Sequence, residues 1–226
     1  GIGEALARHY AAQGATLGLF ARRESELARL EAALASTTVA TYAGDVRDAD
    51  ALARAGADFI ARFGAPDVVI ANAGVSRGTL TDEAADLPAF RVVIETNFLG
   101  MVHTFSPFMA AMRAARAGAL VGVASVGGFR CLPGACAYCG SKSAVITYLE
   151  SLRVELYGSG VAVVTLCPGF IATPLTAKNP YPMPFLMSPE RAARLMADAI
   201  ARRRRFHVLP WQMAWLSRLL RIAPRS

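Results

Sequence analysis

One of the few lysines in this chain follows a tyrosine by one helical turn, in the segment Tyr138-Cys139-Gly140-Ser141-Lys142. The chain has 22 arginines and two lysines, so lysine at position 142 is an unusual choice. In a helix the Tyr138 phenol and the Lys142 ammonium share a face. A positive charge at about 5 Å lowers a phenol pKa, ordinarily about 10, by roughly two units at an effective dielectric near 20. Such a tyrosine can act as general acid toward a carbonyl or general base toward an alcohol. The alternative is that both are surface helix residues paired by chance.

Two further polar residues lie where a parallel sheet could bring them beside this pair. The segment Ala119 to Ala124 reads as a short buried strand, and Ser125 stands at its carboxyl end. Open parallel sheets bind ligands at that edge. Asn97 lies in the helical pattern Phe90 to Met112, as an unusual polar residue between apolar neighbours.

The elements that must position these residues alternate along the chain. Strands are expected at 16–21, 39–44, 67–71, 119–124 and 161–166, and helices at 4–13, 90–112, 138–157 and 189–201. Alternating strands and helices indicate a parallel sheet, and 226 residues suit one large α/β core without an internal repeat or linker.

Together these residues resemble the short-chain dehydrogenases/reductases from Gly1 to about Thr173, with looser agreement to about Leu209. The resemblance implies an α/β, Rossmann-type doubly wound parallel sheet in a single domain, 1–209. It also implies an oxidoreductase that interconverts a carbonyl and a secondary alcohol. Ser125 would hydrogen-bond the substrate oxygen, Tyr138 would give the proton and Lys142 would lower its pKa and hold the nicotinamide ribose. Asn97 would hold a water for proton resupply.

The start of the chain resembles the end of the family's glycine-rich turn, with Gly1, Ile2 and Gly3 as its last three positions. The following helix can accept pyrophosphate at its amino end through free N–H groups and its dipole. The alternative is that both glycines only form a turn. Since a strand precedes this turn in the family, we expect that the first strand of the sheet is missing from the sequence.

Arg22 and Arg23 follow the strand 16–21. In this family the residues at the end of that strand contact the adenosine ribose. NAD-dependent relatives place an acidic residue there, but this chain has Ala21. A 2′-phosphate favours arginine, so the resemblance implies NADP (NADPH), with Arg22 as the main contact. The alternative is that both are solvated arginines at a helix start.

The remaining cofactor contacts are carried over from the family's motifs. Asp45 and Val46 would hold the adenine edge and pack on its ring, although Asp45 also suits a helix cap. Asn72, Ala73 and Gly74 would tie adjacent strands together behind the cofactor. The turn after the strand 161–166 would meet the nicotinamide through Pro168, Gly169, Ile171 and Thr173.

Two regions outside these motifs are expected to determine which substrate binds and whether the protein contacts a membrane. The loop 174–190 should cover the substrate, and its apolar segment Asn179 to Met187 suggests a small hydrophobic substrate. The tail 210–226 can form an amphipathic helix with Trp211, Met213, Trp215, Leu216, Leu219, Leu220 and Ile222 set against Arg218, Arg221 and Arg225. It would pack on its own or a neighbouring subunit, or make peripheral contact with an anionic membrane.

Composition argues against other classes. The net charge of +7 and the pI near 9.7 raise nucleic acid as a partner, but Arg202 to Arg205 complement a helix end and no nucleic-acid motif is present. No apolar run approaches the ~18 residues of a membrane span. Cys131, Cys136, Cys139 and Cys167 lack a compact second ligand pair, so we expect no metal and reduced thiols that fill small apolar spaces.

We therefore expect a cytoplasmic, NADP-dependent oxidoreductase that forms a homodimer or homotetramer through the two long helices, as the resemblance implies. The competing hypothesis is a non-catalytic NADP-binding regulator or membrane-attached scaffold on the same fold, because fold does not determine function.

Overall fold

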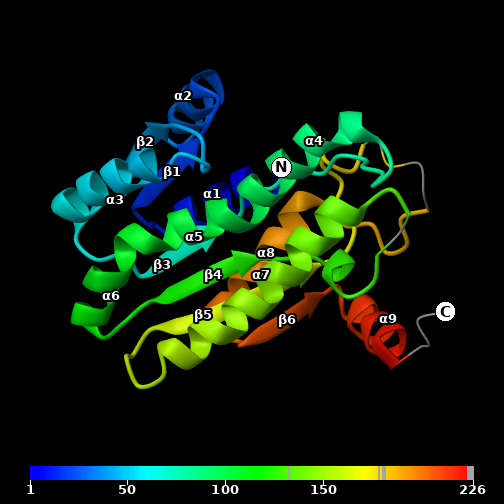
Figure 1. Cartoon of the computed structure of the whole chain (residues 1–226). Coiled ribbons are helices and arrows are strands. Elements are labelled where there is room, and N and C mark those ends of the chain that lie inside the picture. Colours follow the sequence, from blue (N-terminus) through cyan, green and yellow to red (C-terminus); the bar gives the residue numbers. More distant parts are fainter. Residues whose placement is uncertain (132, 178, 180–181, 223–226) are drawn as a thin grey trace.

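The computed structural model describes residues 1–131, 133–177, 179 and 182–222 (Figure 1). The strands are β1 (Leu17–Ala21), β2 (Val39–Ala43), β3 (Val68–Ala71), β4 (Ala119–Val123), β5 (Ala162–Pro168) and β6 (Phe206–Leu209). The longer helices are α1 (Ile2–Ala11), α2 (Glu24–Ala33), α3 (Ala49–Phe63), α4 (Leu87–Ile94), α5 (Gly100–Phe105), α6 (Met109–Ala115), α7 (Cys136–Glu155), α8 (Pro189–Ala201) and α9 (Trp211–Ile222). Strands and helices alternate through most of the chain, which confirms the expected α/β class.

All strand pairs are parallel. β1 pairs with β2, and β3, β4, β5 and β6 form a second run in that order. Among the described strands, β1 and β3 each pair on one side only, so the sheet has a break between them. The strand expected before Gly1 lies outside the sequence and stays a prediction.

Helices cover both faces of the four-stranded run. On one face α1 and α8 pack against inward residues such as Val121 and Val164. On the other face α5, α6 and α7 pack against Leu120 and Val163, the neighbours of those residues in sequence. Because successive side chains in a strand point to opposite faces, this alternation requires a sheet buried on both sides. Figure 1 shows α7 crossing β4 and β5 on one side while α8 lies on the other.

The structure departs from the expected elements at two places. The helical stretch expected from Phe90 to Met112 is divided, with a π-helical turn, η2 (Glu95–Leu99), between α4 and α5, and a 3₁₀ turn, η3 (Ser106–Phe108), between α5 and α6. β6 was not expected, and it adds an edge strand beside β5. In the described part of the chain, no helix combines the length and apolar character needed to cross a membrane.

Candidate active site

Ser125 lies just beyond the carboxyl end of β4 and begins a tight turn, η4 (Val126–Gly128). Its hydroxyl oxygen accepts a hydrogen bond from the Gly127 N–H at 3.1 Å, which fixes the side chain at the amino end of the turn. A Cβ added to Gly127 would lie 3.3 Å from Tyr138 Cε1 and 3.4 Å from Ser125 Oγ. Glycine at 127 therefore lets the turn pass close to both side chains.

Tyr138 and Lys142 both lie in the first two turns of α7, as their spacing predicts. Lys142 is buried, and its Nζ lies 5.9 Å from the centroid of the Tyr138 ring. The ammonium donates a 2.8 Å hydrogen bond to the carbonyl oxygen of Val123, at the end of β4. The Ser125 hydroxyl and the Tyr138 ring both lie close to Gly127, since a Cβ built there would lie 3.4 Å from Ser125 Oγ and 3.3 Å from Tyr138 Cε1. The structure thus brings Ser125, from the end of β4, beside the Tyr138–Lys142 pair of α7.

Burial controls the ionisation of this pair. It raises the pKa of Tyr138, although the nearby Ser125 hydroxyl acts in the opposite direction. Burial also lowers the pKa of Lys142 to about 8, with a smaller opposing effect from Cys167. The expectation that the pKa of Tyr138 is lowered by Lys142 is therefore wrong for this structure. The ammonium is held toward Val123, and removal of the phenol from water outweighs other effects.

Asn97 lies in the π-helical turn η2 and is fully buried. Its side-chain amide donates to the Val75 carbonyl at 2.9 Å and to Ser141 Oγ at 2.9 Å, and its oxygen accepts from the Val75 N–H at 2.8 Å. Ser141 Oγ in turn donates to the Tyr138 carbonyl at 2.7 Å. Asn97 therefore joins the loop after β3 to the first turns of α7. One lone pair of its amide oxygen is left for the expected water.

The residues expected to cradle a dinucleotide converge at the same edge of the sheet. α1 begins after Gly1 without a side-chain cap, so its first N–H groups are available to an anion. A Cβ on Gly3 would lie 2.8 Å from Asn72 Nδ2, and one on Gly74 would lie 3.4 Å from Asn97 Oδ1 and 3.5 Å from Lys142 Nζ. These close approaches require small residues and suit a backbone that binds phosphate and ribose.

Arg22 and Arg23 follow β1, and both are exposed. Because β1 pairs with β2, the residues after the two strands lie side by side, and Arg22 comes within 4.0 Å of the Asp45 carboxylate. Arg47 binds the same carboxylate at 2.8 Å, and this hydrogen bond lowers the pKa of Asp45. The neighbouring Val46 packs on α5, since a Cβ on Gly100 would lie 2.7 Å from its Cγ2.

The turn expected to meet the nicotinamide follows β5. Gly169 donates to the Leu209 carbonyl at 2.7 Å, and a Cβ at Gly169 would lie 2.9 Å from Met213 Cγ of α9. Thr173 lies near the glycine turn, with Cγ2 3.9 Å from a Cβ built on Gly1. Ile171 is buried in the core that α1 and α8 cover, so its contact with a nicotinamide stays a prediction.

Two further expectations concern the four cysteines and the loop 174–190. Cys139 and Cys167 are buried, but Cys131 and Cys136 are exposed, so the expectation that all four thiols fill apolar space is wrong for the latter two. In the loop 174–190, Leu175, Phe185 and Leu186 are exposed, while Lys178, Pro180 and Tyr181 lie outside the described residues.

Sequence reasoning missed three residues that shape the site. Gly127 follows a strand end, and the Gly127-Gly128 pair was a signal for a close approach there. Ser141 was visible inside the tyrosine–lysine segment, but its link to Asn97 is tertiary. Arg47 is bound to Asp45 and lies 3.8 Å from Glu95.

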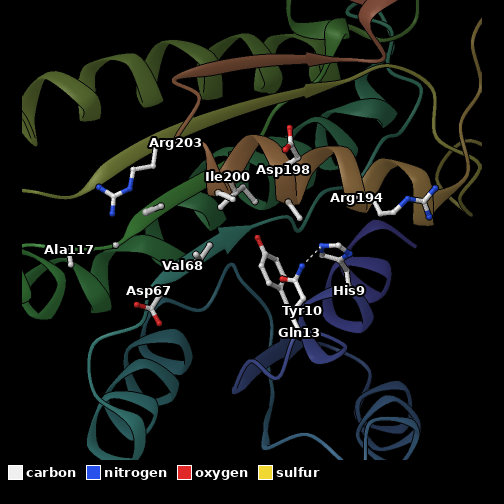
Figure 2. Close-up of a pocket in the computed structure, with 14 residues that line it drawn as sticks. His9, Tyr10, Gln13, Asp67, Val68, Ala117, Arg194, Asp198, Ile200 and Arg203 are labelled. Atoms are coloured by element: carbon white, nitrogen blue, oxygen red, sulfur yellow. Dashed lines mark hydrogen bonds between the residues drawn. The ribbon is translucent and has the colours of Figure 1, made fainter.

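A cavity of about 590 Å³ lies away from these residues (Figure 2). It is lined by His9 and Tyr10 of α1, by Gln13 just after α1, and by Arg194 and Asp198 of α8, together with the residues that begin β3 and β4. The Tyr10 hydroxyl is buried there with no hydrogen-bond partner among the described residues. This cavity is at the amino ends of the strands, opposite Ser125, so we do not assign the chemistry to it.

Comparison with known proteins identifies the class that this fold and site define. A family model described as short chain dehydrogenase matches residues 1–182. A protein named "Uncharacterized oxidoreductase" from Myxococcus xanthus (strain DK1622) is 39% identical over 226 residues, which cover 99% of this chain and 89% of that protein. The chain is therefore an NAD(P)-dependent dehydrogenase/reductase. It belongs to the short-chain dehydrogenase/reductase family.

The chain is also similar to a solved structure and to a plant protein of known name. The alcohol dehydrogenase of the archaeon Thermococcus sibiricus, solved with 5-hydroxy-NADP, superposes with a TM-score of 0.83 at 26% identity, covering 92% of this chain and 91% of that one. 11-beta-hydroxysteroid dehydrogenase 1A of Arabidopsis thaliana is 34% identical over 179 residues, 78% of this chain. That match covers 51% of the plant protein, about half of its length.

Proposed function

We propose that this protein is an NADP-dependent reductase of hydrophobic carbonyl compounds, with Tyr138 as the proton donor. One observation carries this proposal. Ser125 Oγ and the Tyr138 ring both lie close to Gly127 at the carboxyl end of β4, and the Lys142 ammonium lies 5.9 Å from the centroid of the Tyr138 ring. This places a hydrogen-bond donor, a proton donor and a positive charge around one point at the ligand-binding edge of a parallel sheet.

In the reductive direction, NADPH held by these residues would supply the hydride for the carbonyl carbon. The Ser125 hydroxyl donates a hydrogen bond to the carbonyl oxygen and holds it beside the phenol of Tyr138. Tyr138 gives its proton to that oxygen as negative charge develops on it. Its raised pKa keeps the phenol protonated at neutral pH, which suits a general acid. The Lys142 ammonium then stabilises the phenolate and holds the nicotinamide ribose.

Asn97 acts in this scheme as a positioning residue that also holds a water. Its three hydrogen bonds fix the loop after β3 against α7. Asn97 Oδ1 lies near Lys142 Nζ, since a Cβ on Gly74 would lie 3.4 Å from one and 3.5 Å from the other. A water held there would return a proton to Tyr138 after each turnover.

The proposed cofactor contacts follow the cradle at the carboxyl edge. The N–H groups of Gly1, Ile2 and Gly3 would bind the pyrophosphate, and Asn72, Ala73 and Gly74 would lie behind it. Asp45 and Val46 would hold the adenine, and Pro168, Gly169, Ile171 and Thr173 the nicotinamide. The preference for NADP rests on Arg22 and Arg23, which are both exposed. Position 21, where NAD-dependent relatives have an acidic residue, is an alanine in this chain.

The proposed substrate is small and hydrophobic. The exposed side chains Leu175, Phe185 and Leu186 in the loop 174–190 offer apolar surface to cover it. The plant relative is named for a steroid substrate, which agrees with an apolar carbonyl compound. We further propose that the protein acts in the cytoplasm as a homodimer or homotetramer.

A reductive turnover assay tests the proposal. Purified protein is incubated with NADPH and a panel of aliphatic, aromatic and cyclic ketones, and NADPH consumption is followed by absorbance. Consumption with at least one apolar ketone, absent in a Tyr138→Phe variant, is the expected result. NADPH binding by fluorescence without turnover on any ketone would instead support a non-catalytic, NADP-binding regulator.

A further inference from the structure

The last helix has apolar residues on two opposite faces. Met213 and Ser217 of α9 are buried, and α9 packs against β6 and against Gly169 in the turn after β5. The opposite face carries Trp211, Trp215 and Leu219, which are four residues apart and therefore share a side of the helix. A helix that packs on one side ordinarily has a polar outer side. On α9 the outer side is apolar except for Arg218, which is also exposed, so this face calls for a partner.

The outer face is strongly exposed. Trp211 is 69% exposed, Trp215 61% and Leu219 65%. These three side chains form the outer face of α9, and α9 lies at the edge of the molecule beyond β6 (Figure 1). Two tryptophans and a leucine in contact with water are costly unless something covers them, because each tryptophan can bury about 150–250 Å².

The charged residues in the sequence of this C-terminal segment have one sign. The Arg218 guanidinium lies 5.5 Å from the centroid of the Trp215 ring. From Trp211 to the end of the sequence there are three arginines and no aspartate or glutamate. Tryptophan prefers the boundary between water and hydrocarbon, and arginine beside it binds anionic headgroups. This combination is typical of helices that lie in the plane of a membrane surface.

We propose that the outer face of α9 docks on an anionic lipid surface. A second copy of the chain suits this face less well. Three side chains offer roughly 400–500 Å² at most, whereas a stable interface buries about 800 Å² on each partner. The concentration of positive charge would also repel the same face of a second copy.

Docking in this way would bring the proposed active site near the lipid. The inner face of α9 contacts the turn at Gly169, which is proposed to meet the nicotinamide. An apolar substrate dissolved in the lipid would then have a short path to the site. The short substrate path rests on the proposed function, whereas the docking of α9 on lipid does not.

The chain has two tryptophans, and both lie on this face, so intrinsic fluorescence reports on it alone. The purified full chain is titrated with vesicles of phosphatidylcholine and 30% phosphatidylglycerol, and in parallel with phosphatidylcholine alone. We expect a blue shift of the emission and co-sedimentation with the anionic vesicles, and at least about tenfold weaker partition to the neutral ones.

Variants locate the contact. Trp215→Ala should lower partition into anionic vesicles by about tenfold or more, since an exposed indole no longer enters the lipid. Arg218→Glu should lower it by about tenfold on anionic vesicles and much less on neutral ones. Leu87→Ala and Arg54→Glu change an exposed leucine on α4 and an exposed arginine on α3, and should leave partition within about twofold.

Three results would overturn the proposal. One is the absence of both the blue shift and co-sedimentation at every lipid concentration. Another is binding that Trp215→Ala and Arg218→Glu leave unchanged, which would move the contact elsewhere. The third is emission that is blue without lipid and shifts red as dilution lowers the particle mass, because a second copy would then cover the face. None of these results depends on NADPH or on turnover.

Discussion

Tyr138 and Lys142 are close neighbours in the site, yet burial affects the ionisation of each more than the other residue does. Burial raises the pKa of Tyr138 and lowers that of Lys142 to about 8. A phenol that keeps its proton and an ammonium that can lose its own near pH 8 favour reduction at neutral pH.

The pKa of Lys142 predicts how reduction depends on pH. Below about pH 8 the ammonium is charged and can stabilise the phenolate, and above it the charge is lost. We therefore expect kcat for ketone reduction to be flat from about pH 6 to 7 and to fall as pH rises through about 8. A pH profile at saturating NADPH and ketone measures this, and a flat profile to pH 9.5 would contradict it.

Unfolding would not explain such a fall. The pKa of Lys142 in the folded chain is below its ordinary value of 10.5, so between about pH 8 and 10.5 the unfolded chain binds more protons. In that window this residue makes the folded state more stable as pH rises. A melting temperature measured at each pH is the control.

Arg22 predicts the choice of cofactor. A charge-assisted hydrogen bond to phosphate contributes about 1.5–3 kcal/mol, so Arg22→Ala should weaken NADPH binding by about ten- to a hundredfold. NADH lacks the 2′-phosphate, and its affinity should hardly change. Fluorescence titration of both cofactors measures this, with Arg54→Ala as an exposed control on α3. Tighter binding of NADH than of NADPH by the wild-type chain would mean that these arginines have another role.

At the scale of elements, the site depends on how β4, η4 and α7 meet. Ser125 is fixed by the Gly127 N–H, Lys142 by the carbonyl of Val123, and α7 by the link from Asn97 through Ser141. Two of these hydrogen bonds join different elements, Lys142 of α7 to the end of β4 and Asn97 of η2 to Ser141 of α7. Small shifts of the turn should therefore disturb the chemistry before they unfold the protein.

Gly127→Ala tests this dependence. The new Cβ would lie 3.3 Å from Tyr138 Cε1 and 3.4 Å from Ser125 Oγ, so the two side chains must move apart by a few tenths of an ångström. We expect kcat to fall by about tenfold or more with a small change in melting temperature. Gly140→Ala on α7 is the matched control, because a Cβ there meets open space. It should keep full activity and add about 0.5–1 kcal/mol of stability.

Full activity in Gly127→Ala would show that the spacing between Ser125 and Tyr138 is not critical. An equal loss of kcat in Gly140→Ala would show that the start of α7 tolerates no added methyl group, even where that group contacts nothing.

Local patterns predicted most of the elements and the convergence of the polar residues. The buried strand before Ser125 and the spacing of Tyr138 and Lys142 are visible in short windows, and all three lie where parallel topology predicts. β6 escaped prediction because Phe206–Leu209 is four residues long and includes a histidine. The π-helical turn around Asn97 and the pKa direction of Tyr138 depend on tertiary packing, which sequence periodicity does not encode.

At the scale of the whole molecule, exposed apolar side chains predict association. Leu99 ends η2, Val154 lies in the last turn of α7 and Tyr157 lies just beyond α7, and all three are exposed. Burying them against a second copy would stabilise a dimer or tetramer. Light scattering at micromolar concentration should give a mass of two or four times 23.9 kDa. A single 23.9 kDa species would contradict this expectation.

The central claim is that Tyr138 transfers the proton, and Tyr138→Phe tests it most directly. The ring and its packing are kept while the hydroxyl is lost, so NADPH affinity should stay within about threefold and kcat should fall at least about a hundredfold. Tyr157→Phe, an exposed tyrosine just beyond α7, should behave as wild type. Both constants are measured on the best ketone of the panel. A Tyr138→Phe variant that keeps more than about a tenth of the wild-type kcat would show that another group donates the proton.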